Sequence, residues 1–439
     1  MQTFDRNFIK QVFTISIPVI LQQVINICVN LTDNVMLGSF GENQISGAAL
    51  ANQFYFLFQI FCLGLGGGTA VMVNQLWGKQ DIPNIKRLFT LMLRVGIFTA
   101  ILFMIITFLF PDLIMSIFSN DPEVIAAGAS YLKVVAFIYI FHGLTLTLTI
   151  VYRSVGVVRL ALMASVISFG LNIFFNWIFI FGKLGAPRLE IAGAAIGTLI
   201  ARVVECSIVI IYVFVIDKRV RYQISDIMLN CKPIIREFTR LSIPVIISDV
   251  ILALGNNALS IIMGHIGKEM VSANSITMTT VQISTMFILG LSNAASVMVG
   301  NKIGQGDTKT AMGYGYNFLI ISTVVGILAS FIIRLLGPFI VSWYNITEAT
   351  YQCTMELMDA ICLIVIFQSI SSVMTKGVLR GGGDTRFLMF ADVLFLWIVS
   401  VPLGALSGLV WHMSSFWVYT FLKIDMIIKS VWCIYRLYS

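Results

Sequence analysis

Charged side chains are scarce in this chain of 439 residues. Asp, Glu, Lys and Arg together make up 11% of the sequence, against about 25% in a soluble globular protein. Histidine occurs three times and no HExxH-type cluster is present, so the sequence lacks a pattern typical of a metal-dependent enzyme. The seven cysteines form no CxxC pair, which favours a packing role over disulfides or a metal site. No ATP-binding motif is present either. We therefore expect neither an enzyme nor a bound cofactor.

Hydrophobic residues fill most of the chain. They account for 58% of it, and the mean hydropathy is +0.93. Continuous apolar runs of 18 or more residues recur from end to end, and each is long enough to cross a hydrocarbon core of about 30 Å as a helix. A transmembrane β-barrel would instead need short alternating segments. We predict an all-α polytopic membrane protein with twelve transmembrane helices, at residues 11–38, 47–76, 88–110, 125–151, 158–182, 191–216, 237–264, 272–301, 314–336, 353–379, 386–407 and 412–435.

Basic residues gather on one side of these predicted helices. One set of connections is rich in Lys and Arg, including the long segment 217–236, whereas the opposite set holds only Lys183, Arg188 and Lys268. By the positive-inside rule the basic side is cytoplasmic, and both termini lie on it. The net charge of +7 therefore orients the chain in a cell membrane, and no nucleic-acid partner is needed to explain it.

The chain contains an internal repeat. The stretch "SIPVI" occurs at residues 16–20 and 242–246, and at this offset of 226 about 20 of the 66 positions up to Asp81 and Asp307 are identical. Further on, "RSVGVVR" matches "RGGGDTR" at an offset of 227. Six helices per repeat give both halves the same orientation, which is a parallel repeat. We predict two pseudo-symmetric six-helix lobes, residues 1–216 and 237–439, joined by the basic linker 217–236 and enclosing a central cleft.

The first predicted helix carries a polar stripe. Gln22, Asn26, Asn30 and Asp33 are spaced four, four and three residues apart, which places them on one helical face. A carboxylate near a helix centre costs about 2.5–3.5 kcal/mol on insertion scales, so it should face protein or water and find a partner. Asp33 is thus a candidate coupling-ion or proton site. The alternative is an aspartate at the membrane interface, because Asp33 lies near the outer end of this helix.

Partners for Asp33 are expected from the fifth and sixth helices. Asn172 and Asn176 lie one turn apart, and Thr198 is in the next helix. One carboxylate with amide and hydroxyl oxygens would suit Na⁺, although a lone carboxylate could equally bind and release a proton. Alternatively, the two asparagines only join helices, at roughly 0.6 kcal/mol each. Candidates for lining a substrate cleft are Gln22, Asn26, Asn30, Asn52, Tyr139 and Gln282.

Several longer segments resemble a known family. "LTDNVMLGSFG", the following "ALANQFYFLFQIFCLGLGGGTAVMVNQLWGKQD", and in the second half "LGLSNAASVMVGNKIGQGD" and "VLRGGGDTR" look like segments of multidrug and toxic compound extrusion (MATE) transporters. The resemblance covers essentially the whole chain. It implies a secondary antiporter in which Na⁺ or H⁺ moves in while organic, often aromatic and cationic, compounds move out by alternating access. We expect a monomer that acts on small organic cations or drugs within the lipid bilayer.

The resemblance also bears on the ion site. The family's first-lobe cation site combines the first-helix Asp with an Asn and an Asp in the fifth helix and a nearby hydroxyl. Asp33, Asn172 and Thr198 fit this set, while Asn176 stands where the second carboxylate is often found, which leaves the choice between Na⁺ and H⁺ open. Related flippases for lipid-linked saccharides share the general plan. Such a flippase would be expected to carry more unpaired cations in the cleft than Lys133, Arg202 and Arg334.

The second half lacks an equivalent of Asp33, because the offset of 226 places Leu259 there. One branch of the family uses acids in the seventh and tenth helices instead. Asp384 fits the second of these, and Asp249 is the nearest acid to the first. Asp384 also suits the N-cap of the next helix. The role of Asp392 is open.

Overall fold

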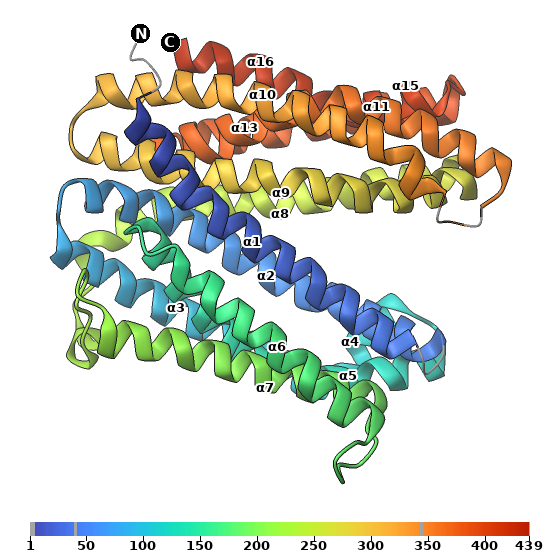
Figure 1. Ribbon diagram of the computed structural model, residues 1–439, viewed down its shortest axis with the longest axis horizontal. Helices are drawn as coiled ribbons and strands as arrows, with labels where there is room; N and C mark the ends of the chain where they lie inside the picture. Colours follow the sequence, from blue (N-terminus) through green and yellow to red (C-terminus); the bar gives the residue numbers. More distant parts are fainter. Residues whose placement is uncertain (1–4, 39–41, 343, 345, 439) are drawn as a thin grey trace. The chain divides into compact units, whose positions relative to one another are not determined.

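The computed structural model describes residues 5–38, 42–342, 344 and 346–438, and among them it contains helices but no strand. Ten helices of 22 to 37 residues dominate. They are α1 (Arg6–Gly38), α2 (Glu42–Gly78), α3 (Ile82–Leu109), α5 (Pro122–Ser154), α6 (Arg159–Phe181), α7 (Glu190–Ile211), α8 (Lys232–Ile266), α9 (Lys268–Gly304), α10 (Thr308–Val341) and α11 (Glu348–Ser372). Figure 1 shows these helices as the long ribbons of the structure.

Two further predicted spans are built from consecutive shorter helices. The first, Thr385–Val410, consists of α13 (Thr385–Leu394), η4 (Phe395–Ser400), α14 (Val401–Ala405) and η5 (Leu406–Val410). The last consists of α15 (Ser415–Leu422) and α16 (Ile424–Tyr438). By length and composition, eleven helices in the described part of the chain can cross a membrane. The predicted all-α polytopic fold is thus confirmed, with a final segment that is divided at Lys423.

The remaining elements are short. They are α4 (Pro111–Phe118), the 3₁₀ helix η2 (Ile224–Met228), α12 (Arg380–Gly382), and the π-helical segments η1 (Tyr212–Ile216) and η3 (Val373–Leu379), which continue α7 and α11. A π-helical turn contains one residue more than an α-helical turn, so the side chains that follow it are rotated around the helix axis.

The internal repeat recurs in the local structure. Asp81 is the N-cap of α3 and its side chain accepts a hydrogen bond from Asn84 N at 3.2 Å. At the equivalent position, Asp307 caps α10 and accepts a hydrogen bond from Thr310 N at 3.0 Å. Each carboxylate satisfies a backbone donor that the first helical turn leaves free. The duplicated sequence therefore produces the same helix start twice.

Packing divides the chain into two compact units. The N-unit contains Leu21–Val73 and Asp81–Thr239, and the C-unit contains Met1–Ile20, Asn74–Gln80 and Arg240–Ser439. Helices α1 and α2 thus contribute residues to both units. In the N-unit, α5 packs against α3 and α7, and α6 against α7; in the C-unit, α9, α10 and α11 pack against one another (Figure 1).

The linker belongs to the N-unit and is firmly held there. Tyr222 is buried, and its hydroxyl oxygen lies 2.7 Å from Thr90 Oγ1. Lys86 Nζ lies 2.7 Å from Asp226 Oδ2. Burial raises the pKa of Tyr222, so this phenol stays neutral and keeps its proton for the hydrogen bond.

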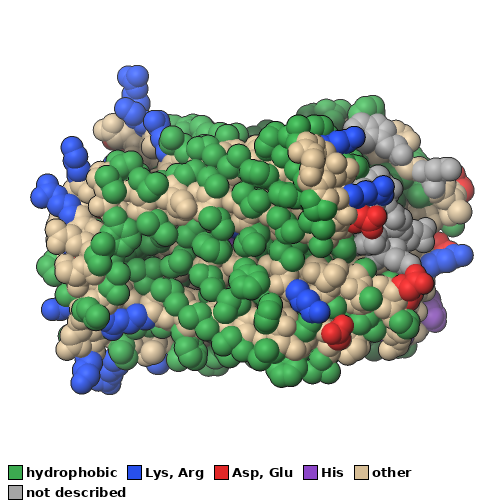
Figure 2. All heavy atoms as spheres, turned by 90° about the horizontal axis from the view of Figure 1, so that it is seen from below, with side chains coloured by type: hydrophobic (Ala, Val, Ile, Leu, Met, Phe, Trp, Pro, Cys, Tyr) green, Lys and Arg blue, Asp and Glu red, His purple; other side chains and the backbone are tan. Residues whose placement is uncertain are grey.

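Large apolar side chains cover much of the surface. Phe98 is 69% exposed, Phe331 is 65% exposed and Ile398 is 65% exposed. On the face seen in Figure 2, hydrophobic side chains cover the middle, Lys and Arg gather at the left end, and acidic and basic side chains are mixed at the right end. Apolar patches of this extent indicate contact with hydrocarbon rather than with water. The protein is an integral, multi-pass membrane protein.

Candidate functional site

Asp33 lies at one end of a chain of hydrogen bonds in the N-unit. Asn176 Nδ2 donates to Asp33 Oδ1 at 2.6 Å and also lies 3.4 Å from Asn172 Oδ1. Asn172 Nδ2 in turn donates to Thr198 Oγ1 at 3.1 Å. The four residues predicted as a cation site therefore form one chain of hydrogen bonds. It joins α1, α6 and α7.

Glycine allows α6 and α7 to approach closely at this chain. A Cβ atom at Gly197 would overlap the side-chain oxygen of Asn176, and one at Gly193 would lie 2.5 Å from the backbone oxygen of Phe179. Small residues permit such close packing of membrane helices. The pattern "GAAIGT" thus places Thr198, the residue after Gly197, within reach of Asn172.

A second polar chain runs beside the first. An Arg153 guanidinium nitrogen donates to Gln22 Oε1 at 3.1 Å, and Gln22 Nε2 donates to Ser165 Oγ at 3.4 Å. Ser165 Oγ donates to Glu205 Oε1 at 3.1 Å, and Arg202 forms an ion pair with Glu205 at 2.6 Å. The Arg202–Glu205 ion pair lies within α7, at a spacing of three residues. The links through Arg153 and Ser165 join different helices, so spacing along the sequence does not indicate them.

Residues of both chains of hydrogen bonds line a small polar cavity. Its polar lining consists of Asn26, Ser165, Ser168, Asn172, Thr198, Arg202 and Glu205. It has room for about one water molecule, so a water or a small ion fits whereas a drug-sized compound does not. The side-chain oxygen of Asn176 is buried beside Gly197 and accepts no hydrogen bond from the described residues. Carboxylate, amide and hydroxyl oxygens are the ligands that a hard cation prefers.

A conventional metal centre is not found in the described part of the chain. No group of three or more His, Cys, Asp or Glu residues there could hold a metal ion. Any cation at Asp33 would rely on amide and hydroxyl oxygens in addition to the carboxylate.

The other cleft candidates lie apart from this cavity. Asn30 and Asn52 are exposed, and Asn52 Oδ1 accepts a hydrogen bond from the Tyr131 hydroxyl at 3.4 Å. Gln282 is also exposed and belongs to α9 in the C-unit. Of the six candidates, only Asn26 lines the cavity, and Gln22 borders it through Ser165.

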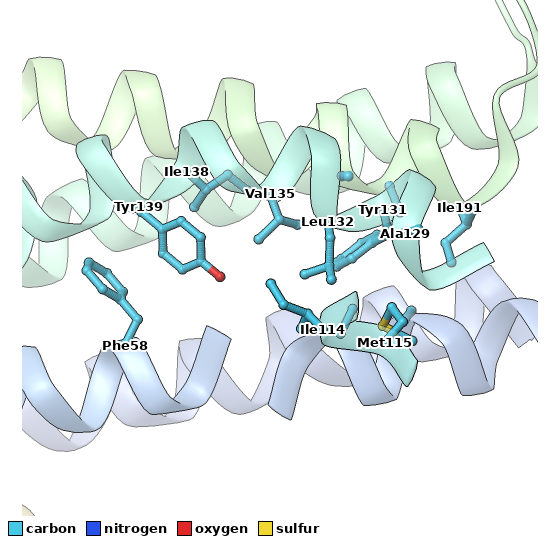
Figure 3. Packing of buried hydrophobic residues seen from close by; sticks show 14 of the residues in the cluster. Phe58, Ile114, Met115, Ala129, Tyr131, Leu132, Val135, Ile138, Tyr139 and Ile191 are labelled. Atoms are coloured by element: carbon cyan, nitrogen blue, oxygen red, sulfur yellow. The ribbon is translucent and has the colours of Figure 1, made fainter. Parts of the chain in front are cut away.

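Tyr139 occupies a different environment from the one expected. It is fully buried in the hydrophobic cluster of the N-unit, and its ring centroid lies 4.8 Å from that of Phe58. Figure 3 shows its side chain among Phe58, Ile138 and Val135. In this structure Tyr139 is a core residue, because α5 turns this face towards α2.

The second-half acids Asp249 and Asp384 are both paired with arginine. Arg380 lies 3.4 Å from Asp249 Oδ1, and Arg436 Nε lies 2.9 Å from Asp384 Oδ2. Asp384 does occupy the N-cap position of α13, but its side chain caps no backbone N–H group. The predicted capping role of this side chain is therefore wrong, because the carboxylate turns to Arg436.

Comparison with known proteins gives consistent results. A family model described as MatE matches residues 18–178 and 244–406. The chain is 26% identical over 413 residues to a probable multidrug resistance protein NorM of Agrobacterium fabrum, covering 90% of this chain and 86% of that protein. It is 24% identical over 397 residues to a protein of the same name from Thermotoga maritima, with 90% and 84% covered.

Solved structures share the fold. One described as the outward-facing conformation of a multidrug resistance MATE family transporter superposes with a TM-score of 0.88, at 17% identity, over 98% of this chain and 96% of that chain. A second, a MOP superfamily transporter from Pyrococcus furiosus whose binding pocket is described as having reverse polarity, superposes with a TM-score of 0.87 at 17% identity and the same coverage. At this identity the likeness concerns the fold alone.

Proposed function

This chain belongs to the multidrug and toxic compound extrusion (MATE) family of transporters, and from that premise we propose that it is a secondary antiporter. It exports organic, cationic and aromatic compounds, and it is driven by inward movement of Na⁺ or H⁺. The observation that carries the proposal is the bond from Asn176 to Asp33, which places a carboxylate of a membrane helix in a network beside a water-sized cavity. An ionisable residue in such a helix is a functional site by default.

Coupling requires that ion binding changes the energy of more than one helix. Asp33 lies on α1, which also contributes residues to the C-unit, while its partners Asn176 and Thr198 lie on α6 and α7. Neutralising Asp33 weakens its bond with Asn176, because a hydrogen bond to a charged acceptor is stronger than one to a neutral acceptor. Proton or Na⁺ binding at Asp33 would thus bias α1 between two states, as alternating access requires.

Asp33 and its partners could bind either Na⁺ or H⁺. For Na⁺, the oxygen of Asn176 and the hydroxyl of Thr198 belong to the same chain of hydrogen bonds as the carboxylate. For H⁺, a lone carboxylate with an amide donor is sufficient. We propose the cell membrane as the location, with both termini cytoplasmic, and a monomer as the working form.

The alternative is a flippase for lipid-linked saccharides, which needs unpaired cations to hold pyrophosphate. Arg202 forms an ion pair with Glu205, and Arg334 forms one with Asp359. Lys133 is exposed. Because the two arginines are neutralised, the contacts support the antiporter more than the flippase.

The test is ethidium efflux from proteoliposomes with an imposed Na⁺ or H⁺ gradient. We expect one of the gradients to drive efflux in the wild type. Asp33→Asn should abolish it, because asparagine can neither bind a proton nor supply the charge for a cation. Asp112→Asn, which removes an exposed carboxylate from α4, is the matched control and should transport normally.

Each result has a clear meaning. The gradient that drives efflux identifies the ion. Efflux that survives Asp33→Asn would move the coupling site elsewhere. If neither gradient moves a cationic dye although the protein is folded, the flippase becomes the better explanation.

A further inference from the structure

A lysine interrupts the last membrane span, which belongs to the C-unit. Helix α15 ends at Leu422 and α16 begins at Ile424, so Lys423 stands between them. The lysine follows the eight residues of α15, about 12 Å along the helix axis. The span therefore breaks close to the middle of a hydrocarbon core of about 30 Å. Broken helices near the membrane midplane are typical of substrate sites in transporters.

The first repeat has no such break. At the offset of 227, Lys423 pairs with Ile196, which lies within the uninterrupted helix α7. The lysine and the break therefore belong to the second half alone, and the duplication does not account for them. An ionisable residue at this depth of a membrane helix is costly and calls for a functional explanation.

The ammonium group of Lys423 is held by an amide rather than by a carboxylate. Its Nζ atom donates to Asn256 Oδ1 of α8 at 3.0 Å. In the described part of the chain, no carboxylate oxygen lies within ion-pairing distance of it. An ammonium group has three N–H donors. The described residues supply a hydrogen-bond partner for one of them, which leaves two for a ligand.

The acid nearest in sequence to Lys423 has other partners. Asp425 attracts Lys423 electrostatically, whereas Lys429 repels it. The two carboxylate oxygens of Asp425 are already bound, one to Ser400 Oγ at 3.1 Å and the other to Lys429 Nζ at 3.0 Å. Asp425 is therefore not a dedicated counter-ion of Lys423.

The charges around Lys423 leave a positive excess. Lys429 Nζ also lies 3.0 Å from Asp392 Oδ1, and the exposed Lys376 interacts electrostatically with Asp392. Two carboxylates, Asp392 and Asp425, thus face three ammonium groups, those of Lys376, Lys423 and Lys429. An anionic group beside Lys423 would balance the excess, whereas a second cation there would be repelled.

A polar surface of α8 adjoins this lysine. Asn256 and Asn257 are exposed, although they lie within a span of mean hydropathy 1.9. Asn256 precedes the end of α8 at Ile266 by about 15 Å, so it also lies at mid-membrane depth. An amide that faces hydrocarbon loses its hydrogen bonds, and polar groups of membrane helices face protein or a water-filled cavity instead. This surface is therefore suited to water or a polar ligand.

Trp397 adds an aromatic ring beside the same stretch of α8. Its Nε1 donates to the backbone oxygen of Ile251 at 3.2 Å, and a Cβ atom on Gly255 would lie 3.4 Å from this nitrogen. Gly255 precedes Asn256, so the indole and the ammonium group of Lys423 approach adjacent residues of α8. The tryptophan is 37% exposed. A ring that is fixed by its N–H group and partly exposed can stack against a flat ligand.

We propose that Lys423, Asn256 and Trp397 form a substrate subsite for an aromatic compound that carries a carboxylate. Lys423 donates to one carboxylate oxygen, the amide nitrogen of Asn256 donates to the other, and the indole stacks on the aromatic ring. Hydrogen bonds between charged groups are the strong ones. A single ammonium group suits a carboxylate, whereas a pyrophosphate would need more cations. This inference rests on the proposed function, since it assumes aromatic cargo, and it adds a negative group to the cationic one.

Binding of two matched dyes to the purified protein in lipid nanodiscs tests the proposal without any ion gradient. Rhodamine B carries a carboxylate, and its ethyl ester is the same cationic dye without that negative charge. Fluorescence anisotropy, with empty nanodiscs as the blank, gives both affinities. We expect the wild type to bind rhodamine B about tenfold or more tightly than the ester, because a hydrogen bond to a charged group contributes about this much.

Variants assign the preference to its source. Lys423→Met should bind the two dyes with about equal affinity, and Lys423→Arg should keep the preference for rhodamine B. Lys133→Met, which removes an exposed lysine of α5 in the N-unit, is the matched control and should also keep it. Trp397→Leu should weaken the binding of both dyes, because stacking does not depend on the carboxylate. If Lys423→Met does not fold, Lys423→Gln, which can still donate to Asn256, serves instead.

The subsite is overturned if the wild type does not prefer rhodamine B, or if the preference persists when Lys423 is replaced by an uncharged residue. Binding of the ester without any preference for rhodamine B would contradict the subsite alone and leave the proposed function intact. Binding of neither dye would count against both the subsite and the proposed aromatic cargo.

Discussion

At the level of single residues, the contact between Gly197 and Asn176 is the most restrictive one near Asp33. The asparagine donates to Asp33, and its oxygen lies where a Cβ atom on Gly197 would have to be. Moving the Asn176 side chain would not relieve the overlap completely. A Cβ atom at this position would also lie 2.9 Å from the backbone nitrogen of Asn176.

We predict that Gly197→Ala disrupts coupling more than folding. The added methyl group displaces the Asn176 amide and so weakens its bond to Asp33, while overpacking of this kind costs about 1–3 kcal/mol of stability. Gradient-driven efflux should fall about tenfold or more, since removing a charged hydrogen bond costs about 1.5–3 kcal/mol. Gly170→Ala on α6, where a Cβ atom meets nothing within 4 Å, is the control. Equal efflux by the two variants would contradict the prediction.

The polar residues could be predicted only where one helix displays them. The spacing of Gln22, Asn26 and Asp33 identified a polar face of α1, and the one-turn spacing of Asn172 and Asn176 did the same for α6. The bond from Arg153 to Gln22 could not be predicted, because sequence spacing does not tell which helices meet. Asp425 and Lys429 lie four residues apart, a spacing that permits the ion pair that they form at 3.0 Å.

At the level of helices, the start of α10 depends on one carboxylate. Hydrogen bonds from Thr310 hold the pKa of Asp307 below its usual value. Because the pKa is lower in the folded state, the ionised group stabilises the fold at pH values above the pKa of the unfolded chain. This contribution is lost as the pH falls through the folded-state pKa.

The Asp307→Asn variant should therefore melt at a lower temperature than the wild type at neutral pH. Asparagine still accepts the capping hydrogen bond but lacks the charge that favours a helix N-terminus. The difference in melting temperature should shrink as the pH falls below about 4, near the pKa of an unfolded aspartate. Thermal unfolding followed by circular dichroism across this range measures it. A difference that does not vary with pH would argue against the carboxylate as its source.

Helix positions followed from the apolar runs, because a membrane span must be long and continuous. The apolar runs do not indicate where a span is interrupted. The π-helical segment Phe395–Ser400 has the same apolar composition as its α-helical neighbours, and the division at Lys423 separates α15 from α16 within one apolar region. Such irregularities arise from packing between helices, which hydropathy does not record.

At the level of the whole molecule, duplication was visible in the sequence but the packing units were not. The repeat divides the chain near its basic linker, whereas contacts assign residues up to Ile20 and Asn74–Gln80 to the C-unit. Two helices of the first repeat therefore contribute to both units. Sequence similarity reports ancestry, and tertiary contacts need not follow the same boundary.

The orientation of the chain in the membrane can be tested directly. The linker is rich in Lys and Arg, whereas the connection between α6 and α7 carries only Lys183 and Arg188. By the positive-inside rule, the linker and the C-terminus lie in the cytoplasm. A green fluorescent protein fused after Ser439 should therefore fluoresce. Alkaline phosphatase inserted at Gly185 should be active outside, while the same insertion at Lys218 should be inactive. The reverse pattern of phosphatase activity would mean that the basic face is external, and Asp33 would then lie near the cytoplasmic end of α1 rather than the outer one.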